Sequence, residues 1–177
     1  MKKKTYEHIT GPFRKNPKQA SMVIAINKVI TYAIYIAYPI LLIYLFLTEG
    51  RGGLITSYIE QGLFARAFLV PFISFILVTI LRNVVNEKRP YEVFEMKPII
   101  PKTTKGKSFP SRHAFSIFVI GITFLATLDT LVPGIVILVM GVMLSVVRVM
   151  GGVHYPRDVI AGALLGILAG LIGFYLL

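Results

Sequence analysis

Five long apolar stretches alternate with polar links along the chain. They cover residues 29–47, 67–81, 114–128, 131–147 and 159–177, and the first and last hold no charged residue. A membrane-spanning helix needs about 20 apolar residues, and only hydrogen-bonded backbone can cross lipid. The pattern therefore predicts an all-α integral membrane bundle of about five transmembrane helices, at residues 29–47, 62–82, 112–129, 131–148 and 157–177.

The second and third apolar stretches are short for a span. Arg66 and Arg82 border the second one, and long basic side chains at a helix end can reach the membrane surface. For any single stretch the alternative is a buried helix of a soluble protein. Five stretches in 177 residues, with 55% hydrophobic residues and a mean hydropathy of +0.74, leave too little polar sequence to cover them.

The links also carry information. The longest one, residues 83–111, contains Pro90, Pro98, Pro101 and Pro110, which predicts an irregular active-site loop with one short helix. The link after the first span is expected to hold a short interfacial helix in its second half.

The whole chain is expected to form a single membrane domain, with a basic N-terminal segment at residues 1–28. The glycines at 162, 166 and 170 share one helical face, which favours close helix packing.

The net charge of +11 is compatible with nucleic acid, an anionic membrane surface or a phosphorylated substrate as partner. The apolar bulk disfavours nucleic acid, and the absence of cysteine excludes thiol and disulfide chemistry. Alternating spans place 17 of the 19 basic residues on one side of the membrane. The positive-inside rule would put that side in the cytoplasm, although several of these charges serve what looks like a phosphate site.

One segment on that side pairs a histidine with a carboxylate. His154 and Asp158 are four residues apart, close to Pro156, where a helix can begin, so they share a helical face. A carboxylate on one ring nitrogen fixes the tautomer and leaves the other nitrogen free to attack. Arg148 lies at the end of the preceding span. The alternative is a surface pair that caps a helix.

Two further segments bring basic groups to the same side. Ser111, Arg112 and His113 stand at the start of the third span, where helix N–H groups suit an anion and a histidine can act as general acid. The alternative is a serine cap beside an ordinary flanking arginine. Arg82 and Arg89 belong to the long link, and alone they would be an ordinary basic flank.

Together these residues meet the needs of phosphoryl transfer. That reaction requires neutralised phosphoryl oxygens, an in-line nucleophile and a proton for the leaving group. Four arginines, two histidines and one aspartate supply these parts. No cysteine and no carboxylate cluster suggests Zn²⁺ or Mg²⁺, so neither a metal nor another cofactor is expected.

The three segments resemble the signature of the type 2 phosphatidic acid phosphatase family, whose fold relatives include the vanadium haloperoxidases. The family pattern is Lys-x6-Arg-Pro, then Pro-Ser-x-His, then Ser-Arg-x5-His-x3-Asp. The chain matches it over residues 60–177 and departs from it twice, with Arg82 in place of lysine and Val147 in place of serine. The resemblance implies an acid phosphatase/vanadium haloperoxidase-like core.

The resemblance also implies a role for each residue. His154 is the nucleophile that forms a phosphohistidine, Asp158 orients it, and His113 protonates the leaving group and later activates water. The phosphoryl oxygens are bound by Arg82, Arg89, Ser111, Arg112 and Arg148. Haloperoxidase activity is not expected, because those relatives are typically larger and soluble.

The expected substrate is a phosphorylated lipid within a bilayer. Candidates are phosphatidylglycerophosphate, phosphatidic acid and undecaprenyl pyrophosphate; the short, five-span layout resembles the bacterial phosphatases that act on the last of these. A lipid-to-lipid phosphotransferase and a non-enzymatic phospholipid-binding or transport protein are the alternatives. The family implies a bacterial plasma membrane and an extracytoplasmic site, against the charge count. The sequence leaves the head group and the oligomeric state open.

Overall fold

The computed structural model describes residues 3–48 and 62–176, and the regular secondary structure in this part of the chain is all α-helix. The prediction of an all-α fold is therefore confirmed. The helices are α1 (Lys3–Lys15), α2 (Pro17–Thr48), α4 (Leu63–Val85), α5 (Pro90–Val93), α6 (Arg112–Thr127), α7 (Val132–Met150) and α8 (Pro156–Tyr175).

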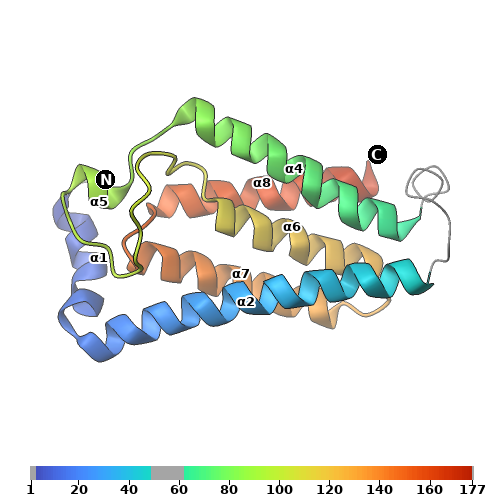
Figure 1. The fold of residues 1–177 in the computed structure, drawn as a ribbon, viewed down its shortest axis with the longest axis horizontal. Helices are drawn as coiled ribbons and strands as arrows, with labels where there is room; N and C mark the ends of the chain where they lie inside the picture. The colour runs from blue at the N-terminus through green and yellow to red at the C-terminus, as the bar shows by residue number, and fades with distance from the viewer. Residues whose placement is uncertain (1–2, 49–61, 177) are drawn as a thin grey trace.

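The bundle is built around α6. This 16-residue apolar helix packs against α2, α4, α7 and α8, and it runs through the middle of the bundle in Figure 1. The four surrounding helices are each long and apolar enough to cross a membrane. Because its neighbours enclose α6, its length need not match the thickness of the bilayer. The expected membrane bundle thus consists of four candidate spans and a shorter apolar helix.

The outer surface of the bundle is apolar. Large hydrophobic side chains are exposed on all four long helices, among them Leu47 at 72%, Phe72 at 52%, Val139 at 55% and Leu168 at 52%. A soluble protein rarely exposes apolar patches of this extent, whereas lipid tails cover them without cost. The exposed faces are those that a membrane protein turns toward lipid.

Glycines on α8 allow close contact with α6. A Cβ atom at Gly162 would lie 2.4 Å from the carbonyl oxygen of Ser111, and one at Gly166 would lie 2.5 Å from that of Phe115. At Gly170 it would lie 2.6 Å from Cγ2 of Ile122. No side chain fits at these positions, which confirms that the glycine spacing serves helix packing.

The N-terminal boundary differs from the prediction. The first span was expected to begin at residue 29 after a basic segment, but α2 begins at Pro17 and a separate helix α1 precedes it. Asn16 divides the two helices, and its side-chain oxygen accepts a hydrogen bond of 3.0 Å from the backbone N–H of Lys18, as an N-cap does. Proline is favoured at the first helical position. The interfacial helix expected before the second span lies outside the described residues.

The polar elements gather at one end of the bundle. Figure 1 shows α1, α5 and the loop that follows α5 at the same end, with the C-terminus at the opposite end. Tyr6 of α1 is fully buried there, with its ring 5.5 Å from that of Phe94 and 5.8 Å from that of Tyr155. This aromatic cluster fastens α1 to the loop and to the start of α8.

Candidate active site

A cavity of about 310 Å³ opens at this polar end. Side chains from α4, the long loop, α6, α7 and the α7–α8 link contribute to its wall. Six of the eight predicted site residues line it: Arg82, Arg89, Arg112, His113, Arg148 and His154. The other lining residues are Thr79, Asn83, Lys102, Thr104 and Lys107. The other two predicted residues, Ser111 and Asp158, are fully buried and are not part of the lining.

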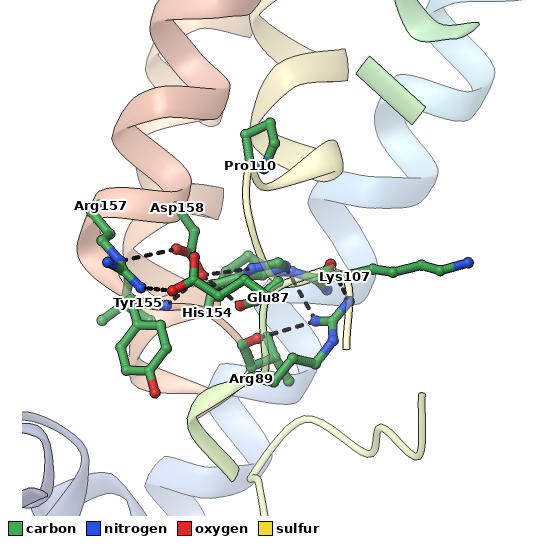
Figure 2. Close-up of polar contacts among 12 residues, drawn as sticks. Glu87, Arg89, Lys107, Pro110, His154, Tyr155, Arg157 and Asp158 are labelled. Atoms are coloured by element: carbon green, nitrogen blue, oxygen red, sulfur yellow. Dashed lines mark hydrogen bonds and ion pairs between the residues drawn. The ribbon is translucent and has the colours of Figure 1, made fainter. Parts of the chain in front are cut away.

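His154 lies in the short link between α7 and α8, and only 1% of its surface is exposed. Its Nδ1 atom is 3.5 Å from Oδ2 of Asp158, and its Nε2 atom is 3.4 Å from Nη1 of Arg89 (Figure 2). Burial lowers the pKa of His154 below its ordinary value of 6.5, against the opposing influence of Asp158, and Arg148 and Arg89 lower it further. A neutral ring with its proton on Nδ1 would leave the lone pair of Nε2 available as a nucleophile.

Asp158 is held in place from two sides. Its Oδ2 atom accepts a hydrogen bond of 2.6 Å from the hydroxyl of Ser108 and one of 3.0 Å from the backbone N–H of Tyr155. The second bond closes the first turn of α8, where a carboxylate is favoured by the helix dipole. The carboxylate is thereby fixed beside His154 in a site without solvent contact.

Arg82 and Arg89 tie the long loop to the helices. Arg82, in the last turn of α4, donates hydrogen bonds to the carbonyl oxygens of Lys107 and Pro110. Arg89 donates to the carbonyl oxygens of Gly106 at 3.0 Å and Val153 at 3.1 Å. Both guanidinium groups therefore form the cavity wall and fix the loop that closes it.

His113 and Arg148 meet across the cavity. Nη2 of Arg148 is 2.9 Å from Nδ1 of His113, and Nη1 donates a hydrogen bond of 3.0 Å to Oδ1 of Asn27 on α2. The guanidinium group of Arg148 stays protonated and donates this hydrogen bond. Nδ1 of His113 therefore accepts it, and the single ring proton of His113 is on Nε2. In this state the ring is neutral and Nε2–H is its hydrogen-bond donor. Arg112, the neighbour of His113, places its guanidinium 5.3 Å from the centre of the Phe75 ring.

Ser111 is fully buried beside the cavity and is not part of its lining. It is the N-cap of α6, and its hydroxyl has no hydrogen-bond partner among the described residues. Its backbone N–H donates a hydrogen bond of 2.8 Å to the carbonyl oxygen of Asp158. Ser111 therefore joins the starts of α6 and α8, and its contact with phosphate stays a prediction.

Val147, which replaces the serine of the family pattern, is buried in an apolar cluster. It packs there with Val23, Ile100 and Val153. The position thus contributes packing to the α7–α8 link instead of a hydroxyl group.

Four of the residues that sequence reasoning missed show how the site is supported. Ser108 bonds to Asp158, Asn27 bonds to Arg148, and Lys102 lines the cavity. The hydroxyl of Tyr6 lies 3.2 Å from the carbonyl oxygen of His154. Asn27 offered a signal, as a polar residue just before an apolar stretch. The other three lie in segments without a pattern, and only the tertiary packing reveals them.

The cavity is strongly positive. Its described lining includes four arginines and two lysines and no aspartate or glutamate. Burial lowers the pKa of Lys102, and the neighbouring arginines lower it further. Within residues 3–48 and 62–176, no group of three or more His, Cys, Asp or Glu side chains could hold a metal ion. The arrangement is therefore suited to an anion with several oxygens.

The fold is shared with two solved membrane proteins. LpxE of Aquifex aeolicus superposes with a TM-score of 0.69 at 22% identity, over 96% of this chain and 92% of that one. The first transmembrane PAP2 type phosphatidylglycerolphosphate phosphatase of Bacillus subtilis superposes with a TM-score of 0.60 at 19% identity, over 96% and 83%. At these identities the comparison establishes the fold alone.

A curated relative is the bacitracin transport permease protein BcrC of Bacillus licheniformis. It is 36% identical over 107 residues, which are 58% of this chain. The aligned region is 52% of the relative, so the chain spans about half the length of the curated protein it matches.

The family is established by the region from α4 to the C-terminus. Residues 64–177 match the sequence model of the PAP2 superfamily, and they include all eight predicted site residues. The helices α1 and α2, with Tyr6 and Asn27, lie outside the match. The chain belongs to the PAP2 superfamily.

Proposed function

We propose that this protein is a metal-independent membrane phosphatase that hydrolyses a lipid phosphate or pyrophosphate through a phosphohistidine. The observation that carries the proposal is the position of His154, buried beside Asp158 on the wall of a cavity with four arginines. The B. subtilis neighbour is named as a phosphatidylglycerolphosphate phosphatase, which supports the same chemistry.

The first half of the proposed reaction transfers the phosphoryl group to the protein. The arginines neutralise the phosphoryl oxygens, and Nε2 of His154 attacks phosphorus in line with the leaving oxygen. A phosphorus–nitrogen bond forms as the phosphorus–oxygen bond to the lipid breaks. The negative charge of the bound phosphate favours a doubly protonated His113, which gives its Nε2 proton to the departing oxygen and becomes neutral.

The second half releases phosphate. His113, now without that proton, removes a proton from a water molecule, which attacks the phosphohistidine. The phosphorus–nitrogen bond breaks, and inorganic phosphate leaves. His154 returns to its neutral state with Asp158 beside it.

An apolar groove beside the cavity supports a lipid substrate. This groove of about 170 Å³ lies between α2, α4, α6 and α7, and its lining combines Thr31 and Ser116 with the apolar or aromatic residues Ile34, Tyr35, Phe75, Ile117 and Leu144. It shares Arg112 and His113 with the polar cavity. A phosphate in the cavity can therefore have its apolar chain in the groove. Phosphatidylglycerophosphate, phosphatidic acid and undecaprenyl pyrophosphate all meet this description.

The test is a phosphate-release screen over these lipids, with purified protein in detergent and EDTA. We expect release by the wild-type protein, inhibition by vanadate, no release by His154→Ala and a strong reduction in Asp158→Asn. His8→Ala is the matched control, because His8 is exposed on α1.

Near-native release by His154→Ala would exclude the proposed nucleophile. Activity that EDTA abolishes and Mg²⁺ restores would exclude a metal-free mechanism, and transfer to a second lipid without free phosphate would indicate a phosphotransferase.

We further propose that the cavity opens on the extracytoplasmic face of a bacterial plasma membrane. The family resemblance supports this side, and the charge count opposes it. Six of the basic residues on that side line the cavity, so their positions follow from binding an anion and carry little information about topology.

Single cysteines in this cysteine-free chain test the orientation. Thr104 is exposed at the cavity, and Thr130 is exposed in the α6–α7 turn at the opposite end of α6. In intact cells a membrane-impermeant maleimide should label Thr104→Cys and spare Thr130→Cys. The reverse pattern would place the cavity in the cytoplasm.

A further inference from the structure

The cavity wall contains two lysines, Lys102 and Lys107, beside its four arginines. Lys102 comes from the long loop, outside all three motifs, and lines the same wall as His154. It is half-buried, and no hydrogen bond or ion pair with another described residue engages its ammonium group. Placing a lysine among guanidinium groups is unfavourable unless an anion lies between them.

The other lysine of the cavity wall has a different role. Lys107 contributes its carbonyl oxygen to Arg82 and Arg89. Figure 2 shows its side chain extending away from His154 and Asp158. Of the two lysines in the cavity wall, Lys102 is thus the one whose ammonium group can bind a ligand.

The loop around Lys102 is held in place before any ligand binds. Glu92 accepts a hydrogen bond of 2.8 Å from the backbone N–H of Gly106, and the hydroxyl of Tyr91 donates to the carbonyl oxygen of Thr104. Gly106 has a φ of 65°, and a Cβ atom there would lie 2.4 Å from Oδ1 of Asn86. A fixed loop keeps Lys102 and the Thr104 side chain at the cavity, which lowers the entropic cost of binding.

The charge of the lining exceeds what one phosphate neutralises. A phosphate monoester carries a charge of about −1.5 to −2 at pH 7, and the four arginines already outweigh it. No carboxylate in the described lining offsets the additional charge of Lys102. A second phosphate on the same ligand would balance it.

We propose that Lys102, assisted by the hydroxyl of Thr104, forms a subsite for a second phosphate, so that the preferred substrate is a lipid diphosphate. This inference rests on the proposed function. The terminal phosphate would lie among the arginines, with the lipid-linked phosphate at Lys102. His154 would attack the terminal phosphorus, the bridging phosphorus–oxygen bond would break, and Lys102 would stabilise the charge on the departing lipid monophosphate. Water then releases the terminal group as inorganic phosphate.

The kinetic test compares two substrates with the same tail, farnesyl diphosphate and farnesyl monophosphate. Lys102→Met should lower kcat/KM for the diphosphate by about tenfold or more, as expected for a lost charge-assisted contact, and change the value for the monophosphate by less than about threefold. Lys102→Arg should restore most of the loss. Lys105→Met is the matched control, because Lys105 is an exposed lysine of the same loop outside the cavity lining. Equal losses on both substrates, or no loss, would overturn the subsite.

A binding test separates this inference from the proposed function. His154→Ala protein is titrated by calorimetry with inorganic pyrophosphate and with orthophosphate, with and without Lys102→Met. We expect the lysine substitution to weaken pyrophosphate binding about tenfold and to leave orthophosphate binding unchanged. Unchanged pyrophosphate binding would overturn the subsite even if the protein is a phosphatase. If the wild-type protein released no phosphate but Lys102→Met selectively weakened pyrophosphate binding, only the proposed reaction would be overturned.

Discussion

Ser108 donates a hydrogen bond of 2.6 Å to Oδ2 of Asp158 across fifty positions of sequence. Both residues are fully buried, so no water competes for the carboxylate. The bond joins the long loop to the first turn of α8 and uses the same oxygen atom that faces His154. The orientation of the proposed nucleophile therefore depends on the loop as well as on α8.

Removing this hydroxyl should slow the reaction. A hydrogen bond to a charged group contributes about 1.5–3 kcal/mol, so Ser108→Ala should lower kcat by roughly 10- to 100-fold if the bond acts through Asp158. The measurement is steady-state phosphate release with a thermal melt of the same sample. Ser145→Ala is the control, because the hydroxyl of Ser145 donates to the carbonyl oxygen of Gly141 within α7 and Ser145 does not line the cavity. A native kcat in Ser108→Ala would mean that Tyr155 alone suffices to hold the carboxylate.

Asn27 should act through Arg148. Its side-chain oxygen accepts from one guanidinium nitrogen while the other faces His113. Asn27→Ala should therefore reduce kcat about tenfold with little change in KM, because a looser Arg148 disturbs the transition state more than binding. Asn27→Asp keeps the acceptor oxygen and should restore most of the activity. Equal activity in all three proteins would remove Asn27 from the site.

Arg82 should tolerate lysine better than alanine. Its guanidinium holds two loop carbonyls, and lysine keeps the charge that the family pattern has there but offers no planar fork. We expect measurable phosphate release in Arg82→Lys and a loss of about 100-fold or more in Arg82→Ala. Arg66→Ala is the control on the same helix, since its guanidinium donates to the carbonyl of Phe174 far from the cavity. Wild-type activity in Arg82→Ala would place Arg82 outside the reaction.

His154 should make the fold less stable in acid. Its pKa is lowered by burial, so below its ordinary value of 6.5 the unfolded chain binds a proton that the folded protein does not. The contribution to stability is complete above pH 6.5 and is lost as the pH falls, by at most about 1.4 kcal/mol per pH unit. Melting temperatures between pH 8 and pH 5 should fall less steeply for His154→Gln than for the wild type. The exposed His8→Gln should follow the wild type, and equal slopes for all three would contradict the assignment.

Gly162 should be intolerant of any side chain. A methyl group there would lie 2.4 Å from the carbonyl oxygen of Ser111, so α6 and α8 would have to separate. Overpacking of this kind costs about 1–3 kcal/mol. Gly162→Ala should lower both the melting temperature and the activity, whereas Gly11→Ala should preserve both, since a Cβ at Gly11 meets nothing within 4 Å. Native stability in Gly162→Ala would show that the helices can part freely.

The helices could be predicted because they follow from local composition. Each apolar stretch corresponds to a helix, and the glycines of α8 fix how closely it approaches α6. The start of α2 could not be placed, because Lys18 and Lys28 interrupt the apolar pattern while the Asn16 cap and Pro17 begin the helix earlier. A helix of this length extends beyond the apolar part of its sequence.

The site could be predicted only as far as its motifs extend. The pair of His154 and Asp158 was visible in the sequence, but the two residues do not share a helical face as expected: His154 precedes α8, and Asp158 lies in its first turn. Ser108 and Asn27 reach the site through the path of the loop and the packing of α2, over 50 and 121 positions respectively. No local pattern encodes such distant contacts, and the hydrogen bond from the backbone N–H of Ser111 to Asp158 is likewise visible only in the folded chain.

Arg112 and His113 border both the polar cavity and the apolar groove. In the proposed reaction this shared wall lies where the phosphate separates from the lipid. The phosphate ion then departs into water, whereas the dephosphorylated lipid diffuses away sideways within the bilayer. In that reaction the two products would enter different phases, so both would seldom return to the site together. Accumulated phosphate can inhibit the protein only from the aqueous side, and accumulated lipid product only from within the membrane.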